Sequence, residues 1–352
     1  MTTSIPSTMR ALALDKYSTP SSYNVSSSFP TPKVTSPTSV LIRCHATSIN
    51  PIDVKVASGA LKMLQSKTFP LQVGYDVAGT VAAVGSSVTK FKVGDEVYSR
   101  IPTDGSVADY CLSTEQATAF KPSSLTWSES ACIPLAALTA YQSLKIASER
   151  LGGLQGKRVL VPGGLSGTGS FAVQLAKNVF GAEVVTTLST GKISKFRELM
   201  GEGYEIVDYT KENVAQKVGA GTVDYLFDTM ATTYSLMGCV KKGGLILSIS
   251  TIPSGSAMEH MGPVPFYMKW ILDFADGAFK LMAWKAGVGY DYVFMHPDGE
   301  DLTELAKYVK EGKVKPIVGR TAKLSDLQGV RDGCQQVYDA KGGVGKFVIE
   351  ID

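Results

Sequence analysis

The spacing of hydrophobic positions changes near residue 134, and this change divides the chain into two regions. Before it, short β-branched runs are separated by Gly, Pro, Ser and Asp clusters, a pattern typical of a β-rich region. It predicts strands at Val40–Cys44, Val77–Val84 and Glu96–Ser99. After residue 134, strand-like runs alternate with stretches of helical spacing. Such alternation predicts a parallel sheet covered by helices on both faces.

The second region is predicted in more detail. Helices are expected at Leu135–Ala147, Gly169–Val179, Lys192–Met200, Asn213–Lys217 and Tyr234–Val240, and strands at Arg158–Val161, Glu183–Leu188, Glu205–Val207, Val223–Asp228 and Gly244–Ile249. A last strand, Val344–Ile351, is expected to return to the first region. The Met- and aromatic-rich segment Thr251–Asp298 either lines a substrate pocket or serves ordinary core and interface packing. Within it, Pro265–Trp284 predicts an amphipathic or buried helix.

A glycine cluster between the strand at 158–161 and the helix at 169–179 predicts a phosphate-binding loop. In a dinucleotide fold such glycines permit a tight turn and a close approach of backbone to pyrophosphate, and the helix N-terminus offers N–H groups. In the G-x-G-x-x-G frame Gly164, Ser166 and Gly169, a serine replaces the middle glycine. Its Cβ is expected to crowd the pyrophosphate, while its hydroxyl is a candidate hydrogen-bond donor to it. A plain strand-to-helix turn is the alternative. The loop residues are Gly163, Gly164, Leu165, Ser166, Gly167, Thr168 and Gly169.

The end of the second strand indicates which cofactor is bound. An NAD-binding chain places Asp or Glu there to hold the ribose diol. Here the only carboxylate of the strand Glu183–Leu188 is Glu183, at the beginning of the strand. The residues that follow Leu188 carry hydroxyls and cations suited to a 2′-phosphate. They are Ser189, Thr190, Lys192, Lys195 and Arg197. The sequence therefore predicts NADPH rather than NADH, with a solvated basic helix start as the alternative.

Composition and charge narrow the classes of partner and compartment. The chain has 352 residues, with 35 Lys and Arg against 32 Asp and Glu spread along it, so neither nucleic acid nor a membrane is expected as a partner. No secretory signal and no membrane span is apparent. The five dispersed cysteines indicate a reducing compartment. We therefore predict a cytoplasmic location.

Several motifs, in their order, resemble the medium-chain dehydrogenase/reductase superfamily over nearly the whole chain. They occupy Ser48–Lys55, Val73–Val81, Val93–Val97, Leu135–Tyr141, the glycine loop, Val207–Lys211 and Gly345–Ile349. The pattern is most similar to quinone oxidoreductases, 2-alkenal reductases and enone reductases. This resemblance implies an α/β fold that combines a GroES-like β-rich catalytic domain, residues 1–133 and 316–352, with a Rossmann doubly wound parallel-sheet domain, residues 134–315. It also implies a cofactor in the cleft between them.

The resemblance further implies an enzyme that works without zinc. Zinc-dependent members bind the catalytic metal through a Cys and a His where this chain has Asn50 and Tyr75. The three scattered histidines, His45, His260 and His296, do not replace these ligands. No metal is therefore expected. Without a Lewis acid, hydride transfer to a quinone or to the C=C bond of an enone or enal is favoured, because the conjugated substrate carries its own negative charge onto oxygen.

Candidate site residues follow from the matched positions. Asn50 is expected at the nicotinamide end of the cleft, Lys55 stands at the place of a proton-relay histidine, and Tyr75 is a candidate phenol donor. Packing or orientation is the alternative role for each. On the cofactor side, Thr139 and the strand end at Ser248, Ile249 and Ser250 are expected near the nicotinamide, and Tyr209 and Thr229 beside the adenosine and a ribose.

Two other functions remain open at this stage. One is a trans-acting enoyl reductase or tailoring reductase of a biosynthetic pathway, and the other is a non-catalytic NADPH-binding structural or interaction protein. The resemblance also favours a homodimer.

Overall fold

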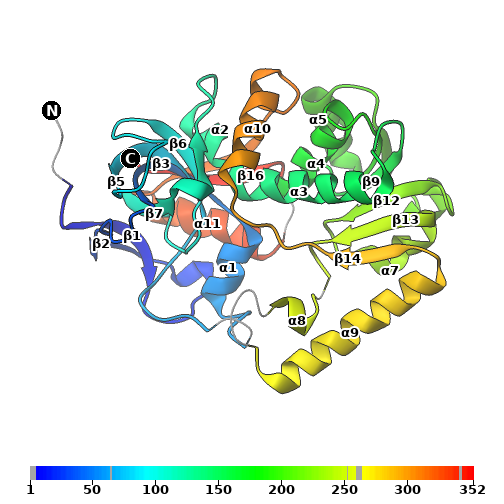
Figure 1. Cartoon of the computed structure of the whole chain (residues 1–352), viewed down its shortest axis with the longest axis horizontal. Helices are drawn as coiled ribbons and strands as arrows, with labels where there is room; N and C mark the ends of the chain where they lie inside the picture. Colours follow the sequence, from blue (N-terminus) through cyan, green and yellow to red (C-terminus); the bar gives the residue numbers. More distant parts are fainter. Residues whose placement is uncertain (1–4, 64–65, 252, 259–263, 341–342) are drawn as a thin grey trace.

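In the residues that the structure describes, three sheets form the framework (Figure 1). The computed structural model describes residues 5–63, 66–251, 253–258, 264–340 and 343–352. The smallest sheet is antiparallel, in the order β2-β1-β4, with β1 (Thr8–Leu14), β2 (Val25–Pro30) and β4 (Leu71–Gln72).

The six-stranded sheet is parallel throughout, in the order β11-β10-β9-β12-β13-β14. Its strands are β9 (Arg158–Pro162), β10 (Glu183–Leu188), β11 (Glu205–Asp208), β12 (Val223–Asp228), β13 (Val240–Ser248) and β14 (Gly289–Tyr292). The strand order reverses between β9 and β12, as in a doubly wound Rossmann sheet. This confirms the predicted parallel sheet, and the predicted strands at 183–188 and 223–228 match the observed bounds.

The seven-stranded sheet brings the two ends of the chain together. Its order is β15-β16-β3-β5-β6-β8, and β7 pairs with β3. The strands are β3 (Ser39–Ile49), β5 (Asp76–Val84), β6 (Glu96–Arg100), β7 (Tyr110–Thr114), β8 (Thr118–Phe120), β15 (Val318–Lys323) and β16 (Lys346–Glu350). Because β16 pairs antiparallel with β3, the prediction that the last strand returns to the first region is confirmed.

The helices cover the sheets and join them. They are α1 (Pro51–Ser58), α2 (Trp127–Ala131), α3 (Pro134–Leu151), α4 (Gly167–Asn178), α5 (Thr190–Met200), α6 (Val214–Val218), α7 (Thr233–Leu236), α8 (Gly255–Met258), α9 (Phe266–Lys285), α10 (Gly299–Lys310) and α11 (Leu327–Tyr338), with short 3₁₀ turns η1 (Pro20–Ser22), η2 (Glu115–Ala117) and η3 (Met237–Cys239). Within the described ranges, no helix has the length and apolarity that spanning a bilayer requires.

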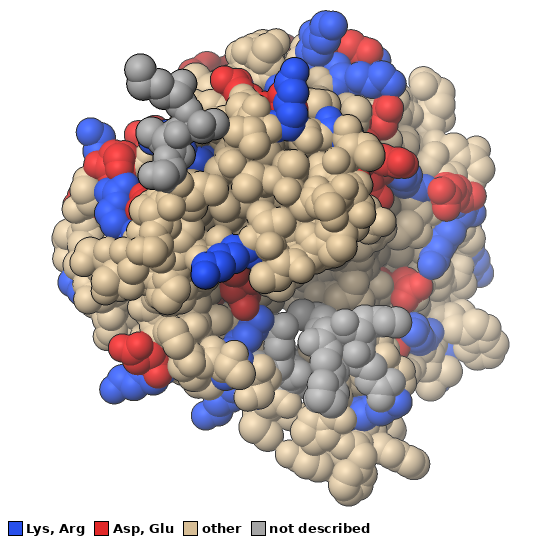
Figure 2. Space-filling view, turned by 60° about the vertical axis from the view of Figure 1, so that its left-hand side comes forward, with Lys and Arg blue, Asp and Glu red and all other residues tan. Residues whose placement is uncertain are grey.

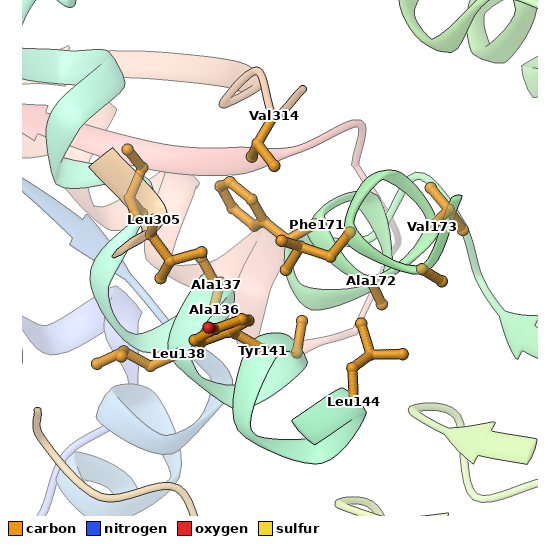
Figure 3. Close-up of a cluster of buried hydrophobic side chains, with 14 of the residues drawn as sticks. Ala136, Ala137, Leu138, Tyr141, Leu144, Phe171, Ala172, Val173, Leu305 and Val314 are labelled. Atoms are coloured by element: carbon orange, nitrogen blue, oxygen red, sulfur yellow. The ribbon is translucent and has the colours of Figure 1, made fainter. Parts of the chain in front are cut away.

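The largest core lies where α3 packs against α4. It holds in place the start of α4, the helix that follows the phosphate loop. Figure 3 shows the side chains that meet there, with α10 and the following turn closing the cluster. Both helices bury small residues at this contact, so their backbones approach closely. The labelled members are Ala136, Ala137, Leu138, Tyr141, Leu144, Phe171, Ala172, Val173, Leu305 and Val314.

The sequence patterns missed several elements. The strands β1, β2, β7, β8, β14 and β15 and the helices α10 and α11 were not predicted. The amphipathic or buried helix predicted at Pro265–Trp284 exists as α9, and many of its apolar side chains are exposed. Hydrophobic spacing predicts a helix equally well whether its apolar face is covered by this chain or by another molecule.

Two helical glycines provide a matched test of the packing around β16. A Cβ at Gly333 in α11 would lie 2.1 Å from the Phe347 ring, whereas a Cβ at Gly191 in α5 meets nothing within 4 Å. We expect Gly333→Ala to lower the free energy of unfolding by about 1–3 kcal/mol through overpacking. Gly191→Ala is expected to raise it by about 0.5–1 kcal/mol through helix propensity. Urea denaturation measures both, and a stabilising Gly333→Ala would contradict this account of α11 on β16.

Candidate active site

The carboxyl ends of β9 and β12 lie side by side at the point where the strand order reverses, the usual ligand crevice of such sheets. The glycine turn leaves β9 at Gly163, whose φ of +71° suits glycine best. Close to this turn lies Met230, which follows β12, because a Cβ on Gly163 would be 3.1 Å from its side chain. The predicted phosphate loop therefore opens into the crevice.

Two further glycines of the loop are required by close packing. A Cβ at Gly164 would lie 2.3 Å from the Thr186 hydroxyl of β10, and one at Gly169 would lie 2.2 Å from the carbonyl oxygen of Gly163. Gly164 therefore packs the turn on the neighbouring strand, and Gly169 packs the helix on the turn. These are roles that glycines have in dinucleotide-binding turns.

Ser166 has a role that the sequence frame did not predict: it is the N-cap of α4. Its hydroxyl accepts from the Gly169 amide at 3.0 Å, and its carbonyl oxygen accepts from the Ser170 amide at 2.9 Å. Among the described residues, the amides of Gly167 and Thr168 have no such partner, so they are the donors left for an anion. The start of α4 thus fits a pyrophosphate. Leu165 is buried, and its carbonyl oxygen accepts from the Gly345 amide at 2.9 Å.

A buried carboxylate organises the other side of the crevice. Asp228, at the end of β12, accepts from the amides of Met230, Thr232 and Thr233. Its backbone oxygen accepts from the Ser250 hydroxyl at 3.1 Å and from the Ile249 amide at 3.1 Å.

The remaining hydroxyls at this edge are also engaged. The Ser248 hydroxyl accepts from the Ser250 amide at 3.2 Å, and the Thr229 hydroxyl donates to the carbonyl oxygen of Pro162 at 2.6 Å. The structure therefore gathers Thr229, Ser248, Ile249 and Ser250 at one edge, where their polar groups order the loops.

The residues predicted to select the cofactor cluster at the start of α5. Ser189 is its N-cap residue, and Thr190 donates its hydroxyl to Asp208 at the end of β11. Lys192 donates to the carbonyl oxygen of Gly343 at 3.2 Å, and the half-exposed Tyr209 follows β11. The hydroxyls of Thr190 and Thr210 lower the pKa of Asp208.

The most unusual contact joins the seven-stranded sheet to the phosphate loop. The stem of Lys346, at the start of β16, crosses the first turn of α4, where a Cβ on Gly167 would lie 2.9 Å from it. Its ammonium donates to the side-chain oxygen of Asn50 and lies 3.7 Å from the Asp76 carboxylate. Asn50 in turn donates to Asp76 at 2.8 Å. All three side chains are buried, so a polar cluster lies directly behind the phosphate loop.

Burial raises the pKa of two carboxylic acids: Asp76 in this cluster and Asp53 beside it. Burial raises the pKa of Asp76, while Lys346 and the donors Asn50, Leu135 and Ser48 oppose the shift. Asp53, the third residue of α1, has its pKa raised by burial to about 7, although the Asn50 amide donates to it at 2.6 Å. One of its carboxylate oxygens is buried without a partner among the described residues. Asp53 is therefore an acid that gives up its proton near neutral pH.

The other predicted residues occupy three different environments. Tyr75 is buried beside Asp76, with the Arg100 guanidinium 4.4 Å from its ring centre, and burial together with Asp104 raises the pKa of its phenol. Lys55 is exposed on α1. Thr139 is buried on α3, and its hydroxyl donates to the carbonyl oxygen of Leu135 at 2.7 Å. Asn50 and Tyr75 thus lie next to Asp76, whereas Lys55 lies on the solvent side.

The donor set does not fit a catalytic zinc. The amide of Asn50 and the protonated phenol of Tyr75 are not the thiolate and imidazole that zinc prefers. All five cysteines are buried and unpaired, and burial raises the pKa of Cys44, Cys132 and Cys239, which disfavours their thiolates.

Within the described part of the chain, one trio of potential ligands clusters elsewhere. It consists of His296, Asp298 and Asp301, but Asp298 caps α10 and Asp301 pairs with Lys145 at 2.8 Å. His260 lies outside the described residues.

Sequence reasoning missed Lys346 as a site residue, although it expected Asp76 to brace the fold, as its bonds to Ser48, Asn50 and Leu135 do. The motif Gly345–Ile349 was noted for the resemblance and as a strand, without a role for its lysine. A signal was nevertheless present, because Lys346 stands next to a hydrophobic run that predicts a buried strand, and a buried lysine requires partners.

A phosphate-binding helix start at the switch point of a Rossmann sheet, with a polar cluster from a second sheet against it, defines a nicotinamide-dependent oxidoreductase. Two family models agree: alcohol dehydrogenase GroES-like domain matches residues 36–147, and zinc-binding dehydrogenase matches residues 203–341. The chain belongs to the medium-chain dehydrogenase/reductase superfamily, among its quinone oxidoreductases and enone reductases. The predicted family and fold class are confirmed.

Three similar proteins illustrate the relationship. The 2-methylene-furan-3-one reductase of Solanum lycopersicum is 34% identical over 325 residues, which are 90% of this chain and 72% of the relative. The mitochondrial NAD(P)H oxidoreductase RTN4IP1 of Mus musculus is 31% identical over 350 residues, 93% of this chain and 86% of the relative. The structure of the quinone oxidoreductase from Coxiella burnetii superposes with a TM-score of 0.80 at 26% identity, covering 98% of this chain and 99% of that one.

The titration of Asp53 gives a prediction about stability. Its folded pKa of about 7 exceeds the unfolded value of 3.8, so its contribution is fully present below pH 3.8 and is lost as the pH rises through about 7. Asp53→Asn imitates the protonated form at every pH. We expect wild type to lose on the order of a few kcal/mol relative to D53N between these two pH values.

Urea denaturation at a series of pH values measures this difference. The control is Asp15→Asn, which removes an exposed carboxylate and is expected to show no comparable change. A difference between wild type and D53N that is independent of pH would show that Asp53 is ionised throughout.

Proposed function

We propose that this chain is an NADPH-dependent, zinc-independent reductase of quinones or of the C=C bond of enones and enals. One observation carries the proposal: the cluster of Asn50, Asp76 and Lys346 lies directly against the first turn of α4. The related enone reductase and quinone oxidoreductase support the substrate class.

The residues that would hold the cofactor lie on both sides of the crevice. The amides of Gly167 and Thr168 would hold the pyrophosphate, and the loops after β12 and β13 would hold the nicotinamide half. When bound, NADPH supplies a hydride to a conjugated carbon. Asn50 is a positioning residue, since both ends of its amide are held by Lys346 and Asp76.

The proton required by the reduced substrate has two candidate sources. The phenol of Tyr75 stays protonated at neutral pH because burial raises its pKa. The exposed ammonium of Lys55 is the second candidate. Neither group needs a metal. A conjugated substrate needs only a donor near its oxygen, because hydride addition delivers charge there.

The preference for NADPH rests on the start of α5. The strand β10 ends without a carboxylate, and Ser189, Thr190 and Lys192 follow it. We expect Ser189→Asp to lower kcat/KM for NADPH by about tenfold or more, through repulsion of the 2′-phosphate and loss of a hydrogen bond, and to leave kcat/KM for NADH nearly unchanged. Steady-state kinetics with both cofactors give the two values.

A matched control places the same charge elsewhere on α5. Ser194 is exposed, and Ser194→Asp is expected to leave the cofactor ratio within about twofold of wild type. Equal losses with NADPH and NADH in S189D would contradict a 2′-phosphate site at this position.

The proposed activity is tested by NADPH oxidation at 340 nm against a 2-alkenal, a cyclic enone, a long-chain enone, a quinone and a saturated ketone. We expect turnover of the conjugated substrates, lower turnover of the saturated ketone, and no effect of chelator. Loss of activity on chelation would contradict the zinc-independent mechanism. Tight NADPH binding without turnover of any substrate would favour a dedicated biosynthetic substrate or a non-catalytic role.

Three further assignments belong to this proposal. The lobes divide into residues 1–133 with 316–352 and residues 134–315. The partner is a small molecule: on the face shown in Figure 2, positive and negative side chains are interspersed, a distribution unlike that of a nucleic-acid-binding surface.

The five unpaired cysteines fit a reducing compartment. The cytoplasm is one such compartment, although the mouse relative is mitochondrial.

A further inference from the structure

Arg100 lies on the face of the seven-stranded sheet that the helices α3 and α10 contact. It is two residues from Tyr98 in β6, so the two side chains point to the same face. The Tyr98 hydroxyl donates to the carbonyl oxygen of Leu302 in α10 at 2.5 Å. Arg100 is also the cross-strand partner of Asp76, which accepts from the Leu135 amide in α3 at 2.8 Å. It therefore lies beside the polar cluster of the candidate active site.

The guanidinium of Arg100 is held in one direction by its neighbours. Its central carbon lies 4.4 Å from the centre of the Tyr75 ring, and Nη1 donates to the carbonyl oxygen of Ile101 at 3.1 Å. The other edge of the group, Nε and Nη2, has no hydrogen-bond partner among the described residues, and Nε is buried. Arginine presents these two nitrogens as a planar fork, so this edge matches two oxygen atoms of one acceptor.

No carboxylate of the described residues neutralises this charge. Asp104 is the ion-pair partner of Lys67, at 2.6 Å, and Asp76 is already bonded inside the polar cluster. Asp53 has a pKa of about 7 and forms no ion pair with the guanidinium. The aromatic ring beside the guanidinium offsets only part of the cost of burying it, because a partly buried cation also needs a counter-charge or further acceptors.

Another partly buried arginine shows what is missing at Arg100. Arg158, at the start of β9, donates through Nη2 to both oxygens of the Glu205 carboxylate, at 2.8 and 2.7 Å. Its Nη1 donates to the carbonyl oxygen of Val218 at 3.0 Å. The charge of Arg158 is thus neutralised within the chain. Arg100 is also partly buried but has no such acid, so we expect a ligand to supply it.

A substrate of the candidate active site is the ligand that would reach this position. The phenol of Tyr75 is a candidate proton donor, and the Arg100 guanidinium lies over the same ring. A compound whose carbonyl oxygen contacts the phenol therefore brings its neighbouring groups within reach of the guanidinium. One guanidinium matches the single negative charge of a carboxylate, whereas a phosphate monoester carries close to two charges.

We propose that Arg100 binds a carboxylate of the substrate, so that the compound reduced by this chain is a conjugated ketone or aldehyde that also carries an acid group. This assignment rests on the proposed function and names the substrate class within it. Arg100 is a specificity-determining residue, because its charge acts on binding, whereas hydride addition to the conjugated carbon is the same in a neutral compound. Its loss should raise KM for acidic substrates and leave neutral ones unaffected.

Steady-state kinetics with a 4-oxo-2-alkenoate and its methyl ester test the proposal, because the two compounds share the conjugated system and differ in one charge. We expect kcat/KM of wild type to be at least about tenfold higher for the acid. Arg100→Gln is expected to remove that preference, mainly through KM, and to change kcat/KM for the ester by less than about threefold. Arg100→Lys keeps the charge without the fork and is expected to be intermediate.

A matched control removes a different arginine. Arg43→Gln, at an exposed residue of β3, is expected to keep the preference of wild type. Unchanged melting temperature and NADPH binding show that R100Q is folded. Equal kcat/KM of wild type for acid and ester would overturn the proposal and leave the proposed function intact. Equal losses with both compounds in R100Q, through kcat, would also overturn it, because Arg100 would then act on the oxygen that receives the charge.

Binding of the saturated product, a 4-oxoalkanoate, gives a measurement that does not depend on turnover. In calorimetry with NADP⁺ present, wild type is expected to bind it at least about tenfold more tightly than R100Q. Such a difference without turnover of acid or ester would contradict the proposed function and support the carboxylate site. Equal affinity of wild type and R100Q, or no binding to wild type, would overturn the carboxylate site.

Discussion

The contact on which the site depends is the ion cluster behind the phosphate loop. Lys346 and Asp76 are both removed from water, and such a pair is tolerable only if additional hydrogen bonds satisfy it. Here Asn50, Ser48 and the Leu135 amide provide them. Because Leu135 belongs to α3, and the lysine stem crosses the start of α4, a single buried cluster ties the seven-stranded sheet to both helices of the largest core.

A second consequence concerns rigidity on the cofactor side. The hydroxyls predicted to contact the cofactor are nearly all engaged with the protein: Thr229 with Pro162, Thr190 with Asp208, and Ser250 with Asp228. These bonds fix the loops before any ligand arrives. A cofactor entering such a site meets preordered backbone amides, which reduces the ordering cost of binding.

The sequence predicted the parallel sheet, the glycine loop and the family correctly, because strand and helix periodicities and ordered motifs are local properties. The structure adds a role for Ser166, whose hydroxyl, proposed as a donor to the pyrophosphate, accepts from the Gly169 amide at the start of α4. The partners of Lys346 could not be predicted, because the long-range pairing of β16 with β3 carries it to Asn50. The spacing predicted the helix α9, but an apolar stripe does not specify what covers it. Asn50 and Tyr75 were proposed from motif position alone; Asn50 donates to Asp76 and Tyr75 lies against Arg100, and their catalytic roles stay predictions.

Because β16 pairs with β3, the seven-stranded sheet cannot be completed until the end of the chain has been synthesised. Asn50 and Lys346 are 296 positions apart in the sequence. The N-terminal strands therefore leave the ribosome long before β16 has been synthesised. Until then Asp76 lacks its cation, and the end of β3 at residues 46–49 lacks its neighbour on one edge, a condition that invites pairing with other chains. The Rossmann sheet, whose strands all lie between β8 and β15 in the sequence, is free to form in the meantime. Nascent chains should consequently rely most on chaperones during the interval in which that edge is open.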